Sequence, residues 1–288
     1  AVGGFSMMPR KPLNGPPVIS TFWPALNCDR AWITPEEAEQ MAGSLSERGP
    51  HDVSIRTLGG FGVSVGSEPV PASAWQSRVA REIVGMLAAS RGRPLHREIV
   101  VERLWPDEDP TKAGNRLSVA LSTIRGVFDP DRSRGADHYL IAARESLALD
   151  LDHVEVDIEA FFEEARRGRA LLRTGDQVMG LSVLRSAEAR YLGEFLEDQP
   201  YADWAIALRE EARTEVMSIA RVLAEAEAGQ GDHDASARWY MRILEQDAYN
   251  EPAHLALVSA MVAAGRHGSA RRLYRIYVSR MGELEVEP

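Results

Sequence analysis

The sequence predicts a multidomain protein in which an α/β winged helix-turn-helix precedes an all-α helical-repeat domain. The first part is predicted by element order: after residue 53 come strand-like alternation, three helical segments and a second hairpin pattern. The second part is predicted by a repeat with an offset of 34 residues, whose first copy contains Gly231, His233, Arg238 and Tyr240. This period is typical of tetratricopeptide helix pairs, so the repeat domain is expected to be tetratricopeptide-like.

The composition is that of an ordinary globular protein. The chain has 288 residues, 44% hydrophobic and 26% charged, and Cys28 is its only cysteine. A disulfide framework and a multi-cysteine zinc or iron–sulfur site are therefore excluded. No stretch approaches the ~18 consecutive apolar residues of a membrane span, and no basic-then-apolar leader is visible. We expect a cytoplasmic segment without membrane contact.

Residues 1–52 contain seven of the 16 prolines, a density that disfavours long helices and central strands. One short helix is predicted from Thr34, the N-cap, to about Arg48, with Pro35 at the first helical position. We interpret residues 1–52 as a linker or the tail of an upstream module.

The winged-helix prediction covers residues 53–150. Strands are expected at 53–58 and 61–65 around a Gly59-Gly60 turn, with a short third strand near Val70. The glycines at 59, 60 and 62 do not indicate a phosphate loop, because the strand–loop–helix context and a Lys-Ser/Thr pair are missing.

The helices of this part have recognisable boundaries. Helices are predicted from Trp75 to Ala89 and from His96 to Trp105, the second with Ile99, Val100 and Leu104 facing inward. The third is predicted over 110–127, with Asp109 as N-cap and Pro110 at its first position. The hairpin, or wing, should comprise 138–142 and 145–149.

Residues 151–288 are predicted to be almost entirely helical. The expected helices are 158–173, 176–192, 201–228, 233–246, 252–264 and 267–281. The aromatic residues Trp204, Trp239, Tyr240 and Tyr274 are interpreted as packing residues and not as ligand contacts.

Charge is distributed unevenly. The net charge is −10, but residues 1–53 carry −2, residues 54–150 carry +1 and residues 151–288 carry −9. Because phosphates repel acidic surfaces, a DNA-contacting module should be the middle one.

The third helix presents side chains suited to DNA. With its apolar stripe inward, the exposed row is Lys112, Arg116, Val119 and Thr123, flanked by Asn115, Ser118, Ser122 and Arg125. Arg116 can bind guanine bidentately, Asn115 can pair with adenine, and the short side chains let the helix approach base edges. The phosphate candidates are Lys112, Arg125, Arg78, Arg97 and Arg144.

No pattern indicates catalysis or a cofactor. The seven histidines are scattered, and no HExxH motif, His/Cys pair or nucleophile–base arrangement is visible. We expect no metal, no cofactor and no enzymatic activity.

Several motifs resemble one family. The first half contains Trp75-x2-Arg78, Arg91-Gly-Arg-Pro94, Arg97-Glu98, Leu104-Trp105-Pro106 and Asn115-Arg-Leu-Ser-Val-Ala-Leu-Ser-x-Ile-Arg125. The second contains Val156-Asp157, Tyr191-x-Gly-Glu-Phe-Leu196, Trp204, Arg209-Glu210, Gly231-Asp232 and Tyr249-x-Glu-x-Ala-His254. In this order they resemble the actinobacterial antibiotic regulatory proteins, the SARP/AfsR family, with an OmpR-like winged helix and a bacterial transcriptional activation domain.

The resemblance implies a transcriptional activator that binds direct repeats in double-stranded promoter DNA, often as a side-by-side dimer, and contacts RNA polymerase. It also implies that 110–127 is the recognition helix and 138–149 the wing. Two departures imply weaker phosphate binding: Val79-Ala80-Arg81 replaces a basic pair, and Gly126-Val127-Phe128 follows Arg125 where basic residues are common.

One alternative stays open. The acidic helical repeat is also suited to be a partner- or effector-binding scaffold with weak or vestigial DNA binding, as the C-terminal part of a larger signalling protein.

Overall fold

The computed structural model describes residues 51–75 and 77–285. The helix predicted over 34–48 and nearly all of the proline-rich region lie outside these described residues.

The strands are β1 (Val53–Arg56), β2 (Gly62–Val65), β3 (Glu68–Pro69), β4 (Leu95–His96), β5 (Leu140–Ala142), β6 (Ser146–Leu149) and β7 (Val154–Val156). The α-helices are α2 (Arg78–Ala89), α3 (Arg97–Leu104), α4 (Pro110–Phe128), α5 (Asp157–Arg173), α6 (Gln177–Arg190), α7 (Ile206–Gly229), α8 (His233–Gln246), α9 (Glu251–Ala263) and α10 (His267–Glu283). Short 3-10 helices, η2 (Ala72–Ala74) and η3 (Asp203–Ala205), precede α2 and α7.

The first sheet has the strand order β3-β2-β1-β7. β1 pairs antiparallel with β2, with Ile55 opposite Val63. The turn between them contains Gly59 at φ +76°, where a Cβ would also lie 3.2 Å from the Leu192 backbone, so the position suits glycine. The predicted hairpin is therefore confirmed.

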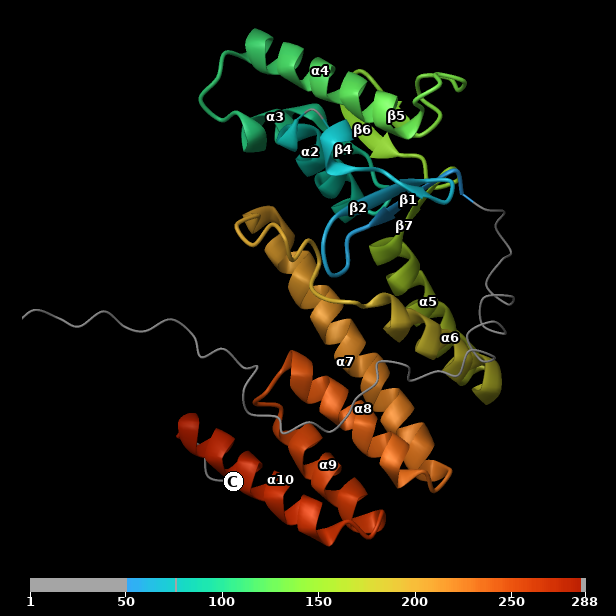
Figure 1. The fold of residues 1–288 in the computed structure, drawn as a ribbon, viewed down its shortest axis with the longest axis vertical. Coiled ribbons are helices and arrows are strands. Elements are labelled where there is room, and N and C mark those ends of the chain that lie inside the picture. Colours follow the sequence, from blue (N-terminus) through green and yellow to red (C-terminus); the bar gives the residue numbers. More distant parts are fainter. Residues whose placement is uncertain (1–50, 76, 286–288) are drawn as a thin grey trace, which may run out of the picture. The chain divides into compact units, whose positions relative to one another are not determined.

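The winged helix is present as predicted: strands, then α2, α3 and α4, then the β5–β6 hairpin (Figure 1). Trp75 is not in the first helix, which begins at Arg78 because the Ser77 hydroxyl caps it by accepting from the Val79 N–H. Trp75 is instead buried, edge to face with Phe61 and Phe128.

The second helix also starts later than predicted. Leu95 and His96 form β4, which pairs with β6, and the Arg97 N–H donates to the Glu145 carbonyl. This pairing takes His96 out of the helix and was not predicted. Ile99 is 39% exposed, so its predicted inward position is wrong, whereas Val100 is fully buried.

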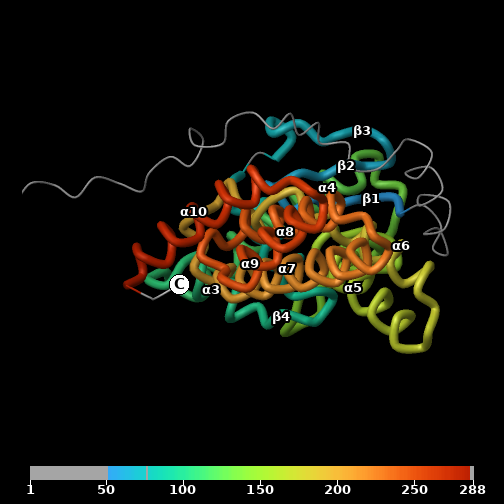
Figure 2. The backbone as a smooth tube through the Cα atoms, turned by 90° about the horizontal axis from the view of Figure 1, so that it is seen from below, coloured from blue at the N-terminus to red at the C-terminus, as the bar shows by residue number. Residues whose placement is uncertain are grey.

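The C-terminal part is an all-α stack, which confirms the predicted fold class. α5 packs on α6, and α7, α8, α9 and α10 pack in chain order (Figures 1 and 2). Tyr240 packs against the core of this stack. Tyr274 is 46% exposed, and its ring centroid lies 5.7 Å from that of buried Tyr277, so Tyr240 and Tyr274 are both packing residues as predicted. α6 ends at Arg190, before the predicted 192.

The long helix α7 begins at Ile206, five residues after the predicted start. Before it, the Arg209 side chain donates to the backbone carbonyls of Phe195, Leu196, Gln199 and Pro200. The Leu196 and Gln199 carbonyls also accept from the N–H groups of Gln199 and Ala202. The Arg209 side chain and these turn bonds together hold the preceding segment in a non-helical path.

The two parts are joined by a strand and a common core. β7, which lies beyond residue 150 and was not predicted, pairs parallel with β1. One cluster of buried side chains includes Ile55 and Phe128 of the winged helix and Phe161 and Leu223 of the helical part. The Leu196 N–H also donates to the Thr57 carbonyl at 2.7 Å. The division of the chain at residue 150 stays a prediction.

Among residues 51–75 and 77–285, no helix has the length and hydropathy of a membrane span. Within the same residues, no His, Cys, Asp and Glu side chains gather in a group that could hold a metal ion.

Candidate nucleic-acid interface

Helix α4 has the boundaries and caps that the sequence predicts. The Asp109 carboxylate accepts from the backbone N–H groups of Thr111 and Lys112, at 3.0 and 3.1 Å. Pro110 occupies the first turn, where a missing N–H costs nothing. The helix ends at Phe128 and Asp129 follows as C-cap.

One face of α4 is buried and fixes its orientation. Its buried residues are Ala113, Leu117, Ala120, Leu121, Ile124, Val127 and Phe128. The spacing of three and four residues is that of a helical stripe, so the opposite face must point to solvent.

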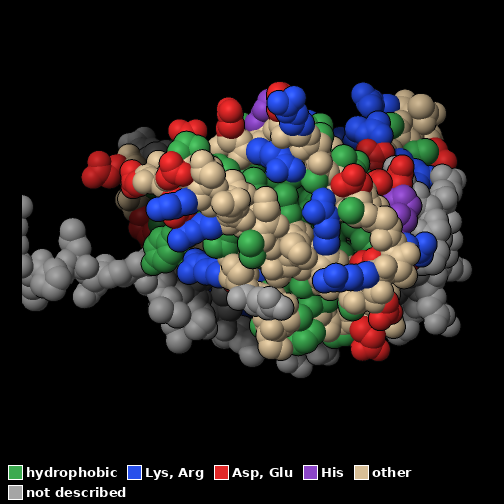
Figure 3. All heavy atoms as spheres, turned by 90° about the horizontal axis from the view of Figure 1, so that it is seen from above, with side chains coloured by type: hydrophobic (Ala, Val, Ile, Leu, Met, Phe, Trp, Pro, Cys, Tyr) green, Lys and Arg blue, Asp and Glu red, His purple; other side chains and the backbone are tan. Residues whose placement is uncertain are grey.

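That opposite face brings the candidate residues together. Lys112, Asn115, Arg116, Ser118, Val119 and Ser122 are exposed, whereas Thr123 and Arg125 are partly buried. Val119, an apolar residue of this face, is 68% exposed. Figure 3, which views the α4 end of the molecule, shows Lys and Arg side chains spread over this face, with acidic side chains mainly toward the edges.

The Arg116 guanidinium is already engaged in an ion pair. Its Nη1 lies 3.1 Å from Oε2 of Glu108, in the segment between α3 and α4. The Arg116 side chain is 59% exposed, but that of Glu108 is only 22% exposed, so the pair is partly screened from solvent.

Arg125 is held more firmly. Its Nε donates to the Ala136 carbonyl at 2.8 Å, and Nη2 lies 3.5 Å from the Asp137 carboxylate. The side chain therefore ties α4 to the loop that follows it, a role that the sequence did not suggest.

The other phosphate candidates surround the helix. Arg78 is exposed at the first turn of α2. Arg97 donates through Nε to the Ala143 carbonyl in the wing turn at 3.0 Å, and Arg144 is exposed beside it. Arg97 thus connects α3 to the wing.

His138, at the base of the wing, is packed. Its ring centroid lies 3.8 Å from that of His153, and its side chain is 20% exposed. Asp52 lies beside it, with Oδ2 3.8 Å from His138 Nε2. A packing role is therefore better supported than phosphate contact.

Sequence reasoning missed two basic residues near α4, Arg132 and Arg134. They lie in the loop between α4 and β5 and, with Arg125, line a cavity of about 280 Å³. Their spacing carries no helical or strand period, so only the folded loop brings them to the end of α4.

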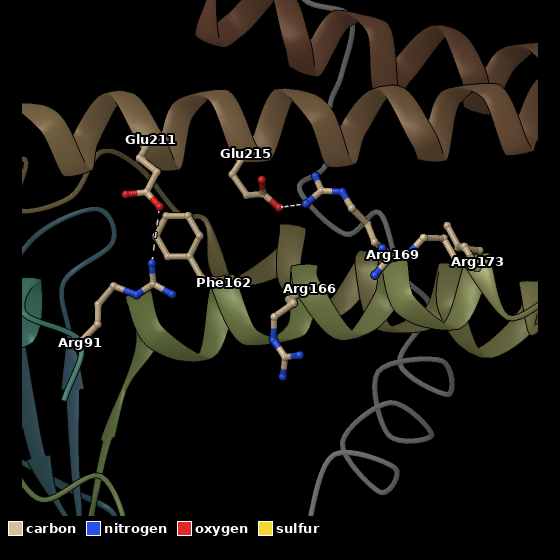
Figure 4. A pocket seen from close by; sticks show the side chains of 8 residues that line it. Arg91, Phe162, Arg166, Arg169, Arg173, Glu211 and Glu215 are labelled. Atoms are coloured by element: carbon tan, nitrogen blue, oxygen red, sulfur yellow. Dashed lines mark hydrogen bonds and ion pairs between the residues drawn. The ribbon is translucent and has the colours of Figure 1, made fainter. Parts of the chain in front are cut away.

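A larger cavity, about 590 Å³, lies between α5 and α7 (Figure 4). Phe162 sits between two cross-element ion pairs, Arg91 with Glu211 and Arg169 with Glu215. The Arg91 guanidinium also stacks over the Phe162 ring, 4.2 Å from its centroid. Arg173 lies at the far end of the cavity.

Comparison with known proteins addresses the helical part directly. Residues 156–288 match the family model of the bacterial transcriptional activator domain. These residues belong to that domain family. Following a winged helix, the domain confirms the resemblance to SARP-type transcriptional regulators.

Relatives of similar architecture come from mycobacteria. The chain is 22% identical over 258 residues to the transcriptional regulatory protein EmbR of Mycobacterium bovis and of Mycobacterium tuberculosis. The match covers 86% of this chain and 63% of EmbR, so the chain spans less than two thirds of these relatives.

A solved structure of Mycobacterium tuberculosis EmbR in complex with a low-affinity phosphopeptide has the same fold. The TM-score is 0.66 at 22% identity, over 83% of this chain and 62% of the EmbR chain. The fold class predicted from the sequence is thereby confirmed.

Proposed function

We propose that the regulator with this bacterial transcriptional activator domain binds double-stranded promoter DNA sequence-specifically and activates transcription. α4 enters the major groove, and the β5–β6 wing contacts the adjacent minor groove or backbone. The observation that carries this proposal is the α4 face, where Arg116 and Asn115 stand exposed among short side chains.

Each candidate residue has a role in this proposal. Arg116 and Asn115 contact base edges, and Ser118, Val119, Ser122 and Thr123 allow close approach. Lys112, Arg125, Arg78, Arg97 and Arg144 contact phosphates, Arg125 and Arg97 while also bracing the loop and the wing. No catalytic step is part of the function.

The helical part supplies the protein contacts. Residues 151–288 carry a net charge of −9, which disfavours DNA and suits a basic surface of RNA polymerase. Two copies of the chain bind side by side on direct repeats.

The test is a fluorescence-anisotropy titration of the full chain against the DNA upstream of its own gene and against a scrambled duplex, each at two salt concentrations. Tight binding to the upstream DNA alone, retained at moderate salt, is expected. Equal, salt-labile binding to both duplexes contradicts sequence-specific recognition.

The 590 Å³ cavity favours a second candidate function, an effector-binding scaffold. Its volume is in the range of small-molecule sites, and its lining combines Phe162 and Leu172 with four arginines and two glutamates. Under this candidate, the chain binds both duplexes of the titration above only weakly, and Arg173→Gln weakens effector binding.

A further inference from the structure

The loop between α4 and β5 is organised by one carboxylate. Asp129 Oδ1 accepts from the Ser133 N–H at 3.0 Å, and Oδ2 accepts from the Arg134 N–H at 2.8 Å. These bonds lower the pKa of Asp129, that from Arg134 most strongly. Because both oxygens are used inside the loop, the carboxylate fixes the loop and keeps its own charge turned toward backbone donors.

The loop carries two arginines back to the end of the recognition helix. Arg132 has a left-handed backbone (φ +51°), and its exposed side chain forms no hydrogen bond or ion pair with the residues that the structure describes. Arg134 is 49% exposed and pairs with Asp52 at 3.2 Å. Both side chains line the 280 Å³ cavity together with Arg125.

This cavity is continuous with the exposed face of α4. Ser122 belongs to that face and also lines the cavity. Three arginines and one aspartate give the lining an excess of two positive charges. Because a helix C-terminus carries partial negative charge, an anion binds there only if such cations outweigh it.

We propose that Arg132 and Arg134 bind a phosphate of the DNA backbone beside the base pairs that α4 contacts. The inference rests on the proposed function and deepens it, because it adds a phosphate site to the same interface. It also supplies the basic groups that the sequence lacks directly after Arg125, where Gly126, Val127 and Phe128 stand.

Nearby acids set the strength of this site. Asp131 and Asp137 are exposed in the same loop but do not line the cavity, and Asp52 forms an ion pair with Arg134. Their repulsion of phosphate lowers the affinity without changing which groups contact the DNA.

The experiment measures the salt dependence of DNA affinity for the full chain and for Arg132→Gln and Arg134→Gln. Both the upstream duplex and the scrambled duplex are used, because a phosphate contact carries no sequence information. The salt slope is the steepness with which the logarithm of the DNA association constant falls with the logarithm of the salt concentration. Loss of one phosphate contact should lower this slope by about 0.9. The ratio of the association constant at 50 mM salt to that at 200 mM salt should then fall roughly 3.5-fold. The matched control is Arg271→Gln, an exposed arginine of α10.

Arg132→Gly separates side chain from backbone, because glycine adopts the left-handed conformation without strain. It should behave like Arg132→Gln while keeping the loop folded. If the salt slopes of the loop variants equal that of Arg271→Gln, this inference is wrong and the proposed function still stands. If the unmodified chain binds neither duplex, the proposed function fails, and this inference fails with it.

Discussion

The Asp157 carboxylate, at the first residue of α5, accepts a hydrogen bond from the backbone N–H of Thr57 at the end of β1, at 2.8 Å. It also accepts from the Leu58 N–H at 2.9 Å and from the Thr57 hydroxyl. One side chain of the helical part thus satisfies the backbone where the first strand of the winged-helix sheet ends. The two parts are connected by polar bonds as well as by their common core.

Replacing Asp157 should therefore destabilise both parts together. We expect Asp157→Ala to lower the free energy of unfolding by about 2–4 kcal/mol, because two backbone N–H groups lose their acceptor. Asp157→Asn should lose less, since its amide oxygen still accepts. Urea unfolding followed by circular dichroism measures both; a loss no larger than that of the exposed control Asp152→Ala would contradict the assigned role.

Arg209 should be the most sensitive arginine of α7. The residue is 9% exposed, and its guanidinium donates to carbonyls of the segment before the helix. Arg209→Ala removes the guanidinium donor from these carbonyls, of which those of Leu196 and Gln199 keep a backbone donor. A loss of about 2–3 kcal/mol in the free energy of unfolding is expected. Arg221→Ala, on the exposed side of the same helix, should change stability by less than about 0.5 kcal/mol. Similar urea midpoints of unfolding for the two variants would show that other donors satisfy these carbonyls.

Replacing Arg116 tests whether this residue recognises a base. Arg116→Ala should cost about 1–3 kcal/mol of binding free energy on the cognate duplex and relax specificity at one position. Arg125→Ala should instead weaken binding to all sequences alike. The measurement is anisotropy on cognate and random duplexes, and equal losses on both for Arg116→Ala would refute a base contact.

Glu108 should restrain Arg116. Because Glu108→Gln removes the charge that pairs with the Arg116 guanidinium, DNA affinity should rise by about fivefold, the value expected for an ion pair of ~1 kcal/mol. Glu102→Gln, at an exposed position of α3, removes the same charge without touching Arg116. An equal gain from Glu102→Gln would attribute the effect to net charge alone.

Burial of Tyr191 should make the stability of the fold depend on pH in the alkaline range. Burial raises the pKa of Tyr191 to about 12, and its hydroxyl has no hydrogen-bond partner among the described residues. The fold favours the neutral phenol, so this contribution to stability is complete below the unfolded pKa of about 10 and is lost as the pH rises through 12.

Tyr191→Phe should therefore leave stability at neutral pH unchanged or slightly higher, because no hydrogen bond is lost. In an ultraviolet titration of the tyrosines, the variant should lack the ionisation at the high-pH end that belongs to Tyr191. A stability loss above about 1 kcal/mol would reveal a partner for the hydroxyl.

Local sequence determined most of the secondary structure around the candidate interface. Asp109-Pro110 set the start of α4, and the stripe from Ala113 to Phe128 set its buried face. Both follow from capping and from the 3.6-residue period, which depend only on near neighbours in the chain. The 34-residue repeat likewise indicated the helical stack before any contact was known.

Tertiary structure alone decided how these elements are joined. β7 pairs with a strand that lies about a hundred residues earlier, and the Arg209 side chain binds carbonyls of the segment before α7. The pairing of Arg116 with Glu108 and the return of Arg132 and Arg134 to α4 also required the folded loops. Such contacts depend on where distant segments meet, which no local period or cap encodes.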